Sequence, residues 1–349
     1  MDRYLSGGVP VKVLLAVLLL LTFSARAAEP DPALIDAARK EGSVNWYSTL
    51  IVNQIVRPMS EAFEKKYPGI KVQYSRATSS DVALKIRNEA RAKRVQADIF
   101  DGSNTVFLLE DASLVADYKP RAAVDWPQSL RDINGHWTAL NLFYWTAAVN
   151  TNAVKADDIP KTYEDLLNPK WKGQIAWTYD LTPGGPPGFI YNILTTMGQD
   201  KGMAYLRAFA KQEPVVIPAA QRVVLDKVVS GEYPLAVMIL NYHATISQGQ
   251  GAPVKWLRME PVLQSTSLVS VVKDAPHPNA ARLLAEFMLS DEGQKIMADN
   301  DYLPASPKIP AKVAENKPDA GGFKVNIVTP DMARDDLPKW VAIYRELFR

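Results

Sequence analysis

Short apolar segments alternate with longer amphipathic ones along most of this 349-residue chain, and no other pattern in the sequence limits the fold as strongly. Val44 to Tyr47, Ile70 to Tyr74 and Ala97 to Phe100 are predicted to be strands. Between them, about Asn53 to Lys66 and Ser79 to about Lys93 place apolar residues at helical spacing. Such an alternation favours a mainly parallel sheet that helices cover on both faces. This region is therefore predicted to be a doubly wound β-α-β-α-β unit.

A second unit of the same kind follows Leu140 to Asn150, a predicted strand in which the chain leaves the first unit. One short helix is expected between Asp157 and Lys172, and a glycine- and proline-rich loop lies at Pro183 to Gly188. A single long helix is expected over Asn279 to Asp299, and the fold class is α/β with two lobes. The remaining predicted strands are Gln174 to Thr178, Val215 to Ile217, Leu235 to Leu240 and Leu268 to Val272, and the remaining helices are Phe189 to Met197, Lys201 to Lys211, Ala220 to Ser230 and Trp340 to Phe348.

The N-terminus has the pattern of a cleaved secretory signal. Lys12 precedes an uninterrupted apolar run from Val13 to Leu21, and Ala25-Arg26-Ala27 offers the small-x-small pattern that a signal peptidase needs. The apolar run is too short to cross a membrane as a helix, which takes about 20 residues. Residues 1–27 are therefore predicted to be a signal peptide, cut after Ala27 or Ala28, and the protein to be periplasmic. An uncleaved N-terminal anchor is the alternative.

Composition excludes several classes of protein. Because the chain has no cysteine, it has no disulfide framework, no lipid-attachment cysteine, no thiolate metal site and no cysteine nucleophile. About 320 residues behind the signal are enough to bury the cores of two domains. The formal charge of +2, from 40 Lys and Arg against 38 Asp and Glu, gives no indication of nucleic-acid binding.

The common motifs of catalysis are absent from the sequence. It has no G-x-S-x-G nucleophile elbow, no H-E-x-x-H zinc helix and no phosphate-binding loop that ends in G-K-S. Asp98 and Asp101 flank the end of a predicted strand at a spacing that could suit paired carboxylates, so an enzyme is one alternative. We predict no enzymatic activity and no resident cofactor.

Five segments carry a resemblance to a known family. They are Glu41 to Ser48 (EGSVNWYS), Phe63 to Val72 (FEKKYPGIKV), Thr162 to Gly173 (TYEDLLNPKWKG), Ser230 to Pro234 (SGEYP), and Pro276 to Ala281 (PHPNAA) with Phe287 and Ser290 to Gln294 (SDEGQ). Together they resemble periplasmic binding proteins of the ferric-iron and phosphonate type. The resemblance extends from about residue 35 to about residue 310, and its motifs are specific for the family but weak for the ligand.

The resemblance implies a type 2 periplasmic-binding-protein-like clamp. Two doubly wound α/β lobes, joined by two crossing hinge strands, would close on a ligand and dock on an ABC permease in the inner membrane. Residues 28–142 would form lobe 1, with a contribution from about residues 265–349, and residues 143–264 would form lobe 2. A monomer is expected, and the family implies no chemistry on the ligand.

Loops that follow the predicted strands supply a candidate cleft. In open parallel sheets the crevice lies beyond the carboxyl ends of the strands, where helix N-termini present free N–H groups to an anion. Four loops qualify because they carry hydroxyl, amide or glycine donors, although each alone could be an ordinary cap or turn. The predicted ligand-binding residues in these loops are Tyr47, Ser48, Thr49, Ser79, Ser80, Ser103, Asn104, Gly184 and Gly185.

Basic and aromatic residues could complete the cleft. Arg76 ends the second strand, and Arg222 stands at the start of a predicted helix, where a positive charge is unfavourable for the helix dipole. A guanidinium holds a carboxylate or phosphonate with two parallel hydrogen bonds, although either arginine could be a solvated surface charge. Tyr144, Tyr179 and Tyr242 fall near strand ends and could wall the cleft. Arg222, Tyr144 and Tyr242 therefore join the predicted ligand-binding residues.

Ferric iron is the alternative ligand. Ferric-binding members of the resembled family carry an adjacent Tyr-Tyr pair after a strand, and phenolate oxygens suit a hard cation. This chain has Asn241-Tyr242-His243 at the matching position, so His243 puts a nitrogen ligand typical of softer divalent ions in place of one tyrosine. The segment from Tyr47 to Asn53 also lacks the histidine that many ferric binders carry there. If iron is the ligand, Tyr242 and His243 are the predicted metal ligands.

The sequence as a whole predicts an exported solute-binding protein that captures a small polar, anionic ligand and delivers it to an ABC importer. Ferric-iron binding is the main alternative, and a sensor component that presents its ligand to a membrane receptor is another. Loop residues of these types do not fix the ligand, so phosphonate, phosphate ester, polyamine and chelated metal all stay open.

Overall fold

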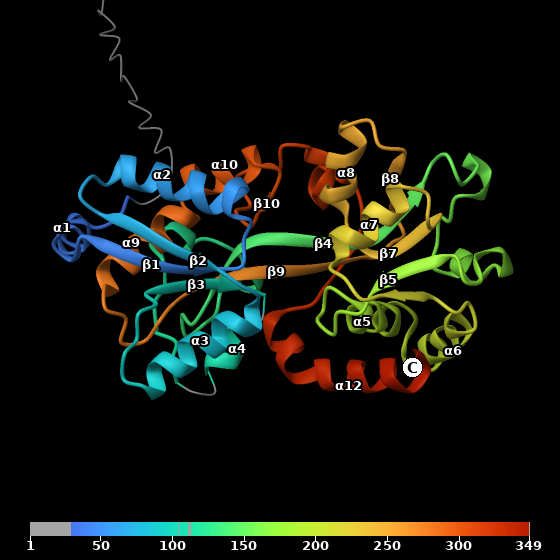
Figure 1. Ribbon diagram of the computed structural model, residues 1–349, viewed down its shortest axis with the longest axis horizontal. Coiled ribbons are helices and arrows are strands. Elements are labelled where there is room, and N and C mark those ends of the chain that lie inside the picture. The colour runs from blue at the N-terminus through green and yellow to red at the C-terminus, as the bar shows by residue number, and fades with distance from the viewer. Residues whose placement is uncertain (1–28, 104, 111–112, 349) are drawn as a thin grey trace, which may run out of the picture.

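The structure is a computed structural model that describes residues 29–103, 105–110 and 113–348. The predicted signal peptide and Asn104 lie outside the described residues. Figure 1 shows two lobes side by side, with long strands running between them. The strands are β1 (Ser43–Ser48), β2 (Lys71–Arg76), β3 (Ile99–Gly102), β4 (Thr138–Asn150), β5 (Ile175–Thr178), β6 (Val215–Ile217), β7 (Leu235–Leu240), β8 (Val254–Leu257), β9 (Val262–Val271), β10 (Leu303–Pro304) and β11 (Val325–Ile327).

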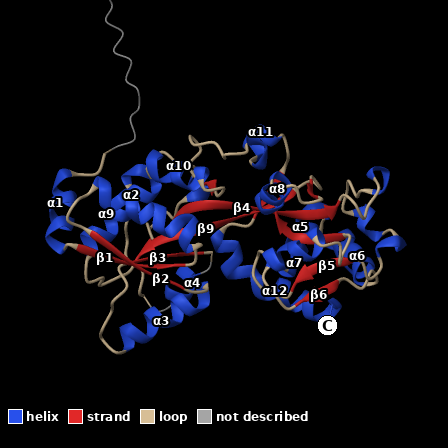
Figure 2. Ribbon diagram, turned by 45° about the horizontal axis from the view of Figure 1, so that its top comes forward, coloured by secondary structure: helices blue, strands red, loops and turns tan. Residues whose placement is uncertain are grey.

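Helices flank this sheet in both lobes, as Figure 2 shows. In lobe 1, α3 and α4 lie on one face, and α1, α2, α9 and α10 lie on the other (Figure 1). The helices are α1 (Pro32–Glu41), α2 (Arg57–Lys66), α3 (Ser79–Arg91), α4 (Thr105–Glu110), α5 (Pro186–Met197), α6 (Gln199–Ala210), α7 (Gln221–Val229), α8 (Asn241–Gly249), α9 (Pro278–Leu289), α10 (Asp291–Asp299), α11 (Pro318–Gly321) and α12 (Pro330–Phe348).

One continuous sheet runs through both lobes in the order β2-β1-β3-β9-β4-β7-β5-β6. Within each lobe the outer strands pair in parallel, as β1 does with β2 and β3, and as β5 does with β6 and β7. At the centre, β4 and β9 pair antiparallel over most of their length, and we call them the hinge strands. The predicted fold, two doubly wound lobes joined by crossing strands, is confirmed.

Strand β1 lies between two helical layers, and its side chains point alternately into one layer and the other. In β1, Trp46 is fully buried in the core cluster under α2 and α9, whereas the next residue, Tyr47, is buried in the cluster under α3 and α4. Successive residues of a strand point to opposite faces, so a strand covered on both faces is apolar throughout. Strands β1 and β3 are buried at most positions in this way, whereas the edge strand β2 exposes Lys71, Gln73 and Tyr74.

The predicted long helix over residues 279–299 is wrong, because two helices, α9 and α10, meet at Ser290. Ser290 has extended backbone angles (φ −67°, ψ 163°), and its hydroxyl caps α10 by accepting a hydrogen bond from the Gly293 N–H at 3.2 Å. A Cβ on Gly293 would stand 2.1 Å from the Phe287 carbonyl oxygen. The apolar spacing continues across this break, so periodicity alone did not show it.

Two other expected elements also differ. The short helix expected between residues 157 and 172 is a series of 3₁₀ turns, which include Glu164–Leu167 and Pro169–Trp171. Strand β9 begins at Val262 and not at Leu268, and its polar residues from Gln264 to Ser267 are all buried. Their polarity concealed the strand, because a run of polar side chains in a sequence is more typical of a loop.

The C-terminal helix packs on lobe 2. Helix α12 lies against α5 and α6, and its Phe348 ring meets Trp177 edge to face at a centroid distance of 4.9 Å. Trp340 packs on Tyr191 of α5 with the two rings tilted and their centroids 4.8 Å apart. The lobe boundaries stay a proposal, but residues 318–348 pack with lobe 2, whereas the sequence placed residues 265–349 with lobe 1.

Candidate functional site

A cleft of about 850 Å³ opens between the two lobes. Its walls come from strand ends and helix starts, which is where doubly wound sheets place their ligands. The hinge strands and the start of α12 also contribute. The lining residues are Thr78, Ser79, Ser80 and Ser103 from lobe 1; Phe143, Trp145, Ser265 and Thr266 from the hinge strands; Thr178, Tyr179, Asp180, Leu181, Thr182, Pro183, Gly184, Ala220, Gln221 and Leu240 from lobe 2; and Val328, Thr329, Pro330 and Ala333 from the tail.

Lobe 1 presents hydroxyl groups and the start of α3 to the cleft. The Thr78 hydroxyl caps this helix by accepting a hydrogen bond from the Asp81 N–H at 3.2 Å. The backbone N–H groups of Ser79 and Ser80 lie in the first helical turn, where no intrahelical acceptor exists. The helix dipole adds a partial positive charge at this end. This wall therefore offers several donors to an anionic group.

Gly102 lets the end of β3 approach these hydroxyl groups. Its φ is +144°, and a Cβ there would stand 2.2 Å from Thr105 Oγ1 and 2.7 Å from Ser79 Oγ. A side chain at this position would clash with these two hydroxyl groups and would be strained at this φ. The close packing of the lobe 1 wall therefore requires glycine.

Two buried carboxylates stabilise lobe 1, and each holds a different segment. Asp101 accepts hydrogen bonds from Trp46 Nε1 at 2.8 Å and from the Thr49 N–H and hydroxyl at 2.8 and 2.6 Å. Burial raises the pKa of Asp101, while these hydrogen bonds oppose the shift. Asp98 instead accepts from the Asn45 N–H and from the N–H and Nδ1 of His277. The two side chains thus serve as structural acceptors for separate loops, and this is not the shared site that paired carboxylates would form.

Asp180 organises the facing wall in lobe 2. Its Oδ1 accepts a hydrogen bond from the Thr182 N–H at 3.2 Å, and its Oδ2 accepts one from Gln221 Nε2 at 3.1 Å. The same Gln221 amide also donates to the Gly184 carbonyl at 3.2 Å, so the loop after β5 is tied to the first turn of α7. A Cβ on Gly185 would stand 1.9 Å from the Asp180 carbonyl oxygen, so this turn also requires glycine.

The hinge strands give the cleft an aromatic surface. Trp145 is 7% exposed, and its Nε1 donates a hydrogen bond to Ser265 Oγ at 2.7 Å. A Cβ on Gly184 would stand 2.6 Å from the Trp145 ring, so the loop of lobe 2 packs directly on the indole. Phe143 lies next to it, with ring centroids 5.7 Å apart. Tyr179 adds a ring that is 52% exposed.

The structure brings some of the predicted ligand-binding residues into the cleft and leaves others out. Ser79, Ser80, Ser103 and Gly184 line it. Thr49 and Gly185 support neighbouring loops, through Asp101 and Asp180 respectively. The remaining predicted residues do not line the cleft, and they are Tyr47, Ser48, Tyr144, Arg222 and Tyr242, while Asn104 lies outside the described residues.

Side-chain direction explains why Tyr47 and Ser48 are not in the cleft. Tyr47 points to the α3 face of the sheet, where its hydroxyl donates to Glu89 Oε1 at 2.7 Å. Ser48 is fully buried, and its hydroxyl accepts a hydrogen bond from the Leu50 N–H at 3.1 Å. Their position near a strand end led to the prediction that both residues bind the ligand, but the backbone directs their side chains into the interior of the protein.

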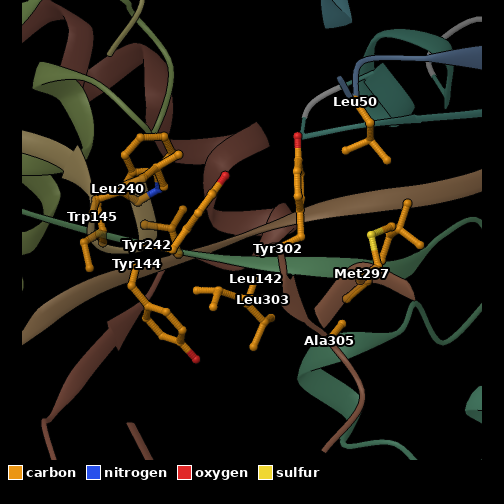
Figure 3. Packing of buried hydrophobic residues seen from close by; sticks show 14 of the residues in the cluster. Leu50, Leu142, Tyr144, Trp145, Leu240, Tyr242, Met297, Tyr302, Leu303 and Ala305 are labelled. Atoms are coloured by element: carbon orange, nitrogen blue, oxygen red, sulfur yellow. The ribbon is translucent and has the colours of Figure 1, made fainter. Parts of the chain in front are cut away.

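The three tyrosines near the hinge strands divide into two groups. Figure 3 shows Tyr242 and Tyr302 with their hydroxyl groups pointing the same way, while Tyr144 points in the opposite direction. Tyr144 packs edge to face on Phe323 at 5.5 Å, away from the other two. The rings of Tyr242 and Tyr302 are 5.8 Å apart. Burial raises the pKa of Tyr242 well above its usual range and that of Tyr302 to about 12.

Arg222, in α7, and His243, in α8, do not line the cleft, and the charge of Arg222 acts on the His243 imidazole. Arg222 forms an ion pair with Asp226 on the solvent side of α7, with Nη2 and Oδ1 2.9 Å apart. His243 is mostly buried, and its Nδ1 has no hydrogen-bond partner among the described residues. Burial and the positive charge of Arg222 lower the pKa of His243 to about 4. The imidazole is therefore neutral at physiological pH.

Several cleft residues were not predicted. Asp180 and Gln221 follow predicted strands, as the chosen loops do, so the same rule could have found them. Thr329 precedes a helix and caps it by accepting from the Met332 N–H at 3.3 Å, which is a recognisable start signal. Ser265 and Thr266 gave no such signal, because they lie in the part of β9 that the sequence did not reveal as a strand.

Metal-ligand clusters and membrane-spanning helices are both absent from the described residues. No group of three or more His, Asp or Glu side chains is placed to hold a metal ion there. Likewise, no helix in the described part of the chain combines the length and the apolar character needed to span a membrane.

Several known proteins are similar to this chain in sequence or in fold. The chain is 22% identical to iron uptake protein A1 of Synechocystis sp. over 316 residues. The aligned region covers 86% of this chain and 84% of the relative. Iron-bound HitA from Pseudomonas aeruginosa superposes with a TM-score of 0.71 at 22% identity, covering 87% of this chain and 99% of HitA. The binding protein AfuA from Actinobacillus pleuropneumoniae, solved with fructose-6-phosphate, gives a TM-score of 0.71 at 20% identity, covering 88% and 98%.

A family model extends over most of the chain. The model for bacterial extracellular solute-binding proteins matches residues 79–334, which include most of the lining of the cleft and both hinge strands. The resemblance seen in the sequence is thereby confirmed. With its two lobes, its hinge strands and its interlobe cleft, this chain belongs to the bacterial extracellular solute-binding proteins.

Proposed function

We propose that this protein carries a small organic anion with a polar body to an ABC importer from the periplasm, as a monomer. The observation that carries the proposal is the cleft itself, which has about 850 Å³ of space, hydroxyl groups on both walls and aromatic rings between them. A cleft of this size suits an organic molecule rather than a single ion, since small-molecule sites range from about 300 to 1,000 Å³.

The lobe 1 wall is suited to the anionic group. Ser79 and Ser80 combine two hydroxyl groups with the free N–H groups of the α3 N-terminus, where the helix dipole favours negative charge. Arg76 adds a cation nearby: its Nε lies 3.4 Å from the Thr49 carbonyl oxygen. Its side chain is exposed and forms no ion pair among the described residues; it stands two residues before Thr78 without itself lining the cleft, and we expect it to contact the anion once the ligand is bound.

Calorimetric titration of the mature protein tests the proposal. Four probe anions form two matched pairs: glycerol 3-phosphate with propyl phosphate, and 3-aminopropylphosphonate with propylphosphonate. At least one should bind, and Arg76→Ala should weaken its binding about tenfold or more, because a charge-assisted hydrogen bond is lost. Arg222→Ala is the matched control, and it should leave affinity within about threefold because Arg222 pairs with Asp226 away from the cleft. Binding of ferric iron with none of the anions would contradict the proposal.

Ferric iron is a second candidate, supported by relatives and by one pair of side chains. Iron uptake protein A1 and iron-bound HitA carry iron in their names. In this chain, Tyr242 and Tyr302 direct their hydroxyl groups the same way and could supply two phenolate ligands (Figure 3). His243 is the weaker of the two ligands predicted from the sequence, because the positive charge of Arg222 acts on its imidazole and would also repel a cation bound there.

An absorption band distinguishes this second candidate. Iron bound to the two phenolates should give a visible tyrosinate-to-iron band that weakens in both Tyr242→Phe and Tyr302→Phe. Tyr144→Phe is the matched control, since its hydroxyl group points the other way. A protein that shows no such band with ferric citrate, while it binds an organic anion, does not use iron as its ligand.

A further inference from the structure

Asp180 differs in charge from everything else that lines the cleft. Among the described lining residues it is the sole Asp, Glu, Lys, Arg or His, and the others are hydroxyl, amide, aromatic, glycine, proline or aliphatic residues. An anionic ligand would be repelled by this carboxylate if its charge lay beside it. The Asp180 carboxylate must therefore have a different role from the hydroxyl groups of lobe 1, which are suited to the anionic group.

The carboxylate of Asp180 is held in place but only partly satisfied. It accepts one hydrogen bond at each oxygen, from the Thr182 N–H and from Gln221 Nε2. A carboxylate can accept about four hydrogen bonds, so about two positions stay open. Asp180 has no cationic partner within ion-pair distance in the described part of the chain, and its side chain is partly buried in the cleft wall. Its open positions are available to groups that enter the cleft.

Loop geometry fixes where this acceptor stands. The Asp180 N–H donates to Thr178 Oγ1 at 3.2 Å, and Thr178 Oγ1 donates to the Ala219 carbonyl at 2.7 Å. Together with Gln221, these bonds join the loop after β5 to the loop before α7. A carboxylate that is held from both sides keeps one orientation, which is the condition for discriminating between ligands.

We infer that Asp180 selects ligands that carry a hydrogen-bond donor, a hydroxyl or ammonium group, at the end remote from their anionic group. The inference rests on the proposed function, since it assumes that Ser79 and Ser80 of lobe 1 hold the anion. A donor on the ligand forms a charge-assisted hydrogen bond with Asp180, whereas a ligand without one leaves the carboxylate desolvated and unpaired.

The two lobes divide recognition between them. Lobe 1 binds the anionic end through helix α3, and lobe 2 binds the donor end through Asp180, so only a ligand with both ends contacts both walls. Such a ligand favours the closed clamp, because it has its full set of contacts only when the lobes approach each other. Anions that lack the donor bind one lobe and favour closure less.

The matched probe pairs test this division by calorimetric titration of the full mature protein. Wild type should bind glycerol 3-phosphate and 3-aminopropylphosphonate about tenfold or more tightly than propyl phosphate and propylphosphonate, respectively. In Asp180→Asn the preference for the ammonium probe should fall by about tenfold to a hundredfold, while the weak binding of the two alkyl probes should stay the same or improve. Asp200→Asn, an exposed aspartate at the start of α6, is the control and should keep the wild-type preferences.

The outcomes separate the inference from the proposed function. If only the hydroxyl probe or only the ammonium probe shows the preference and loses it in Asp180→Asn, the inference holds and the donor is identified. If all four anions bind wild type with equal affinity, or if Asp180→Asn keeps the preference, the inference is overturned while the proposed function stands. If none of the four binds, both are overturned. Thermal unfolding of each variant confirms that the protein titrated is folded.

Discussion

At the scale of single residues, buried polar groups set the shape of the cleft. The exposed polar residues that line it were easier to predict from the sequence than these buried groups. Ser79, Ser80 and Ser103 were predicted because they follow strands and start helices, and such positions are exposed by geometry. Tyr47 occupies a similar position but turns away, since a strand-end rule gives the place of a residue and not the direction of its side chain. Asp101, which holds the neighbouring loop, could not be recognised without its partners.

His243 makes stability depend on pH. Its pKa is lowered to about 4 in the folded protein by burial and by the charge of Arg222, against an ordinary value near 6.5. Between these values the unfolded chain binds more protons than the folded one, so stability is fully present above about pH 6.5 and falls as the pH drops towards 4. The free energy of unfolding should decrease by up to about 1.4 kcal/mol per pH unit in this window because of His243 alone.

Urea unfolding at a series of pH values measures this contribution. His243→Gln should remove it, so that the difference in unfolding free energy between wild type and variant changes steadily from pH 6.5 to pH 4. His136→Gln serves as the control, because His136 is partly exposed beside Asp117, with Nε2 and Oδ1 3.1 Å apart. The assignment fails if His243→Gln and wild type keep parallel pH profiles.

At the scale of elements, local bonding decided where helices end, and hydrophobic spacing did not. Helices α9 and α10 share one apolar stripe, yet the Ser290 hydroxyl starts a new helix, and Gly293 allows its first turn to pass the Phe287 carbonyl. In the same way β9 extends into a polar segment because β4 supplies its hydrogen bonds, as in the pairing of Leu142 with Thr266. Element type was therefore predictable from pattern, whereas boundaries depended on partners distant in sequence.

The turn between α9 and α10 can be tested with two glycines. Gly293→Ala should destabilise the protein by about 1–3 kcal/mol, since its Cβ would stand 2.1 Å from a backbone oxygen that cannot move aside cheaply. Gly249→Ala, in α8, meets no heavy atom within 4 Å, so its effect should stay within about 1 kcal/mol. Chemical unfolding of both variants provides the comparison, and equal losses of stability would show that the turn tolerates a side chain.

At the scale of the whole molecule, the two-lobed plan followed from the alternation of strands and helices, but the route of the tail did not. The chain returns to lobe 2 after α10, and α12 then covers α5 and α6 through rings such as Trp340 and Phe348. Its apolar residues predicted a helix without indicating which lobe it covers. The tail brings Thr329 and Pro330 to the cleft, so the site is completed by the last segment of the chain.

This arrangement predicts that ligand binding makes the molecule more compact. The lobes are connected at the cleft by the hinge strands, and a ligand that contacts both walls shifts the population towards the closed form. Small-angle scattering of the mature protein should therefore show a smaller radius of gyration with the tightest-binding of the four probe anions at a hundredfold excess over its dissociation constant. The same excess should stabilise the protein by about 2.7 kcal/mol.

Glycerol at the same concentration is the control for solvent effects, since it lacks the anionic group. Asp180→Asn should bind the anion at lobe 1 but compact less than wild type at equal saturation, because one of the two walls has lost its contact. This difference cannot arise from affinity alone when both proteins are saturated. A radius of gyration that stays constant on binding, in a protein whose melting temperature rises, would mean that the ligand binds without closing the lobes.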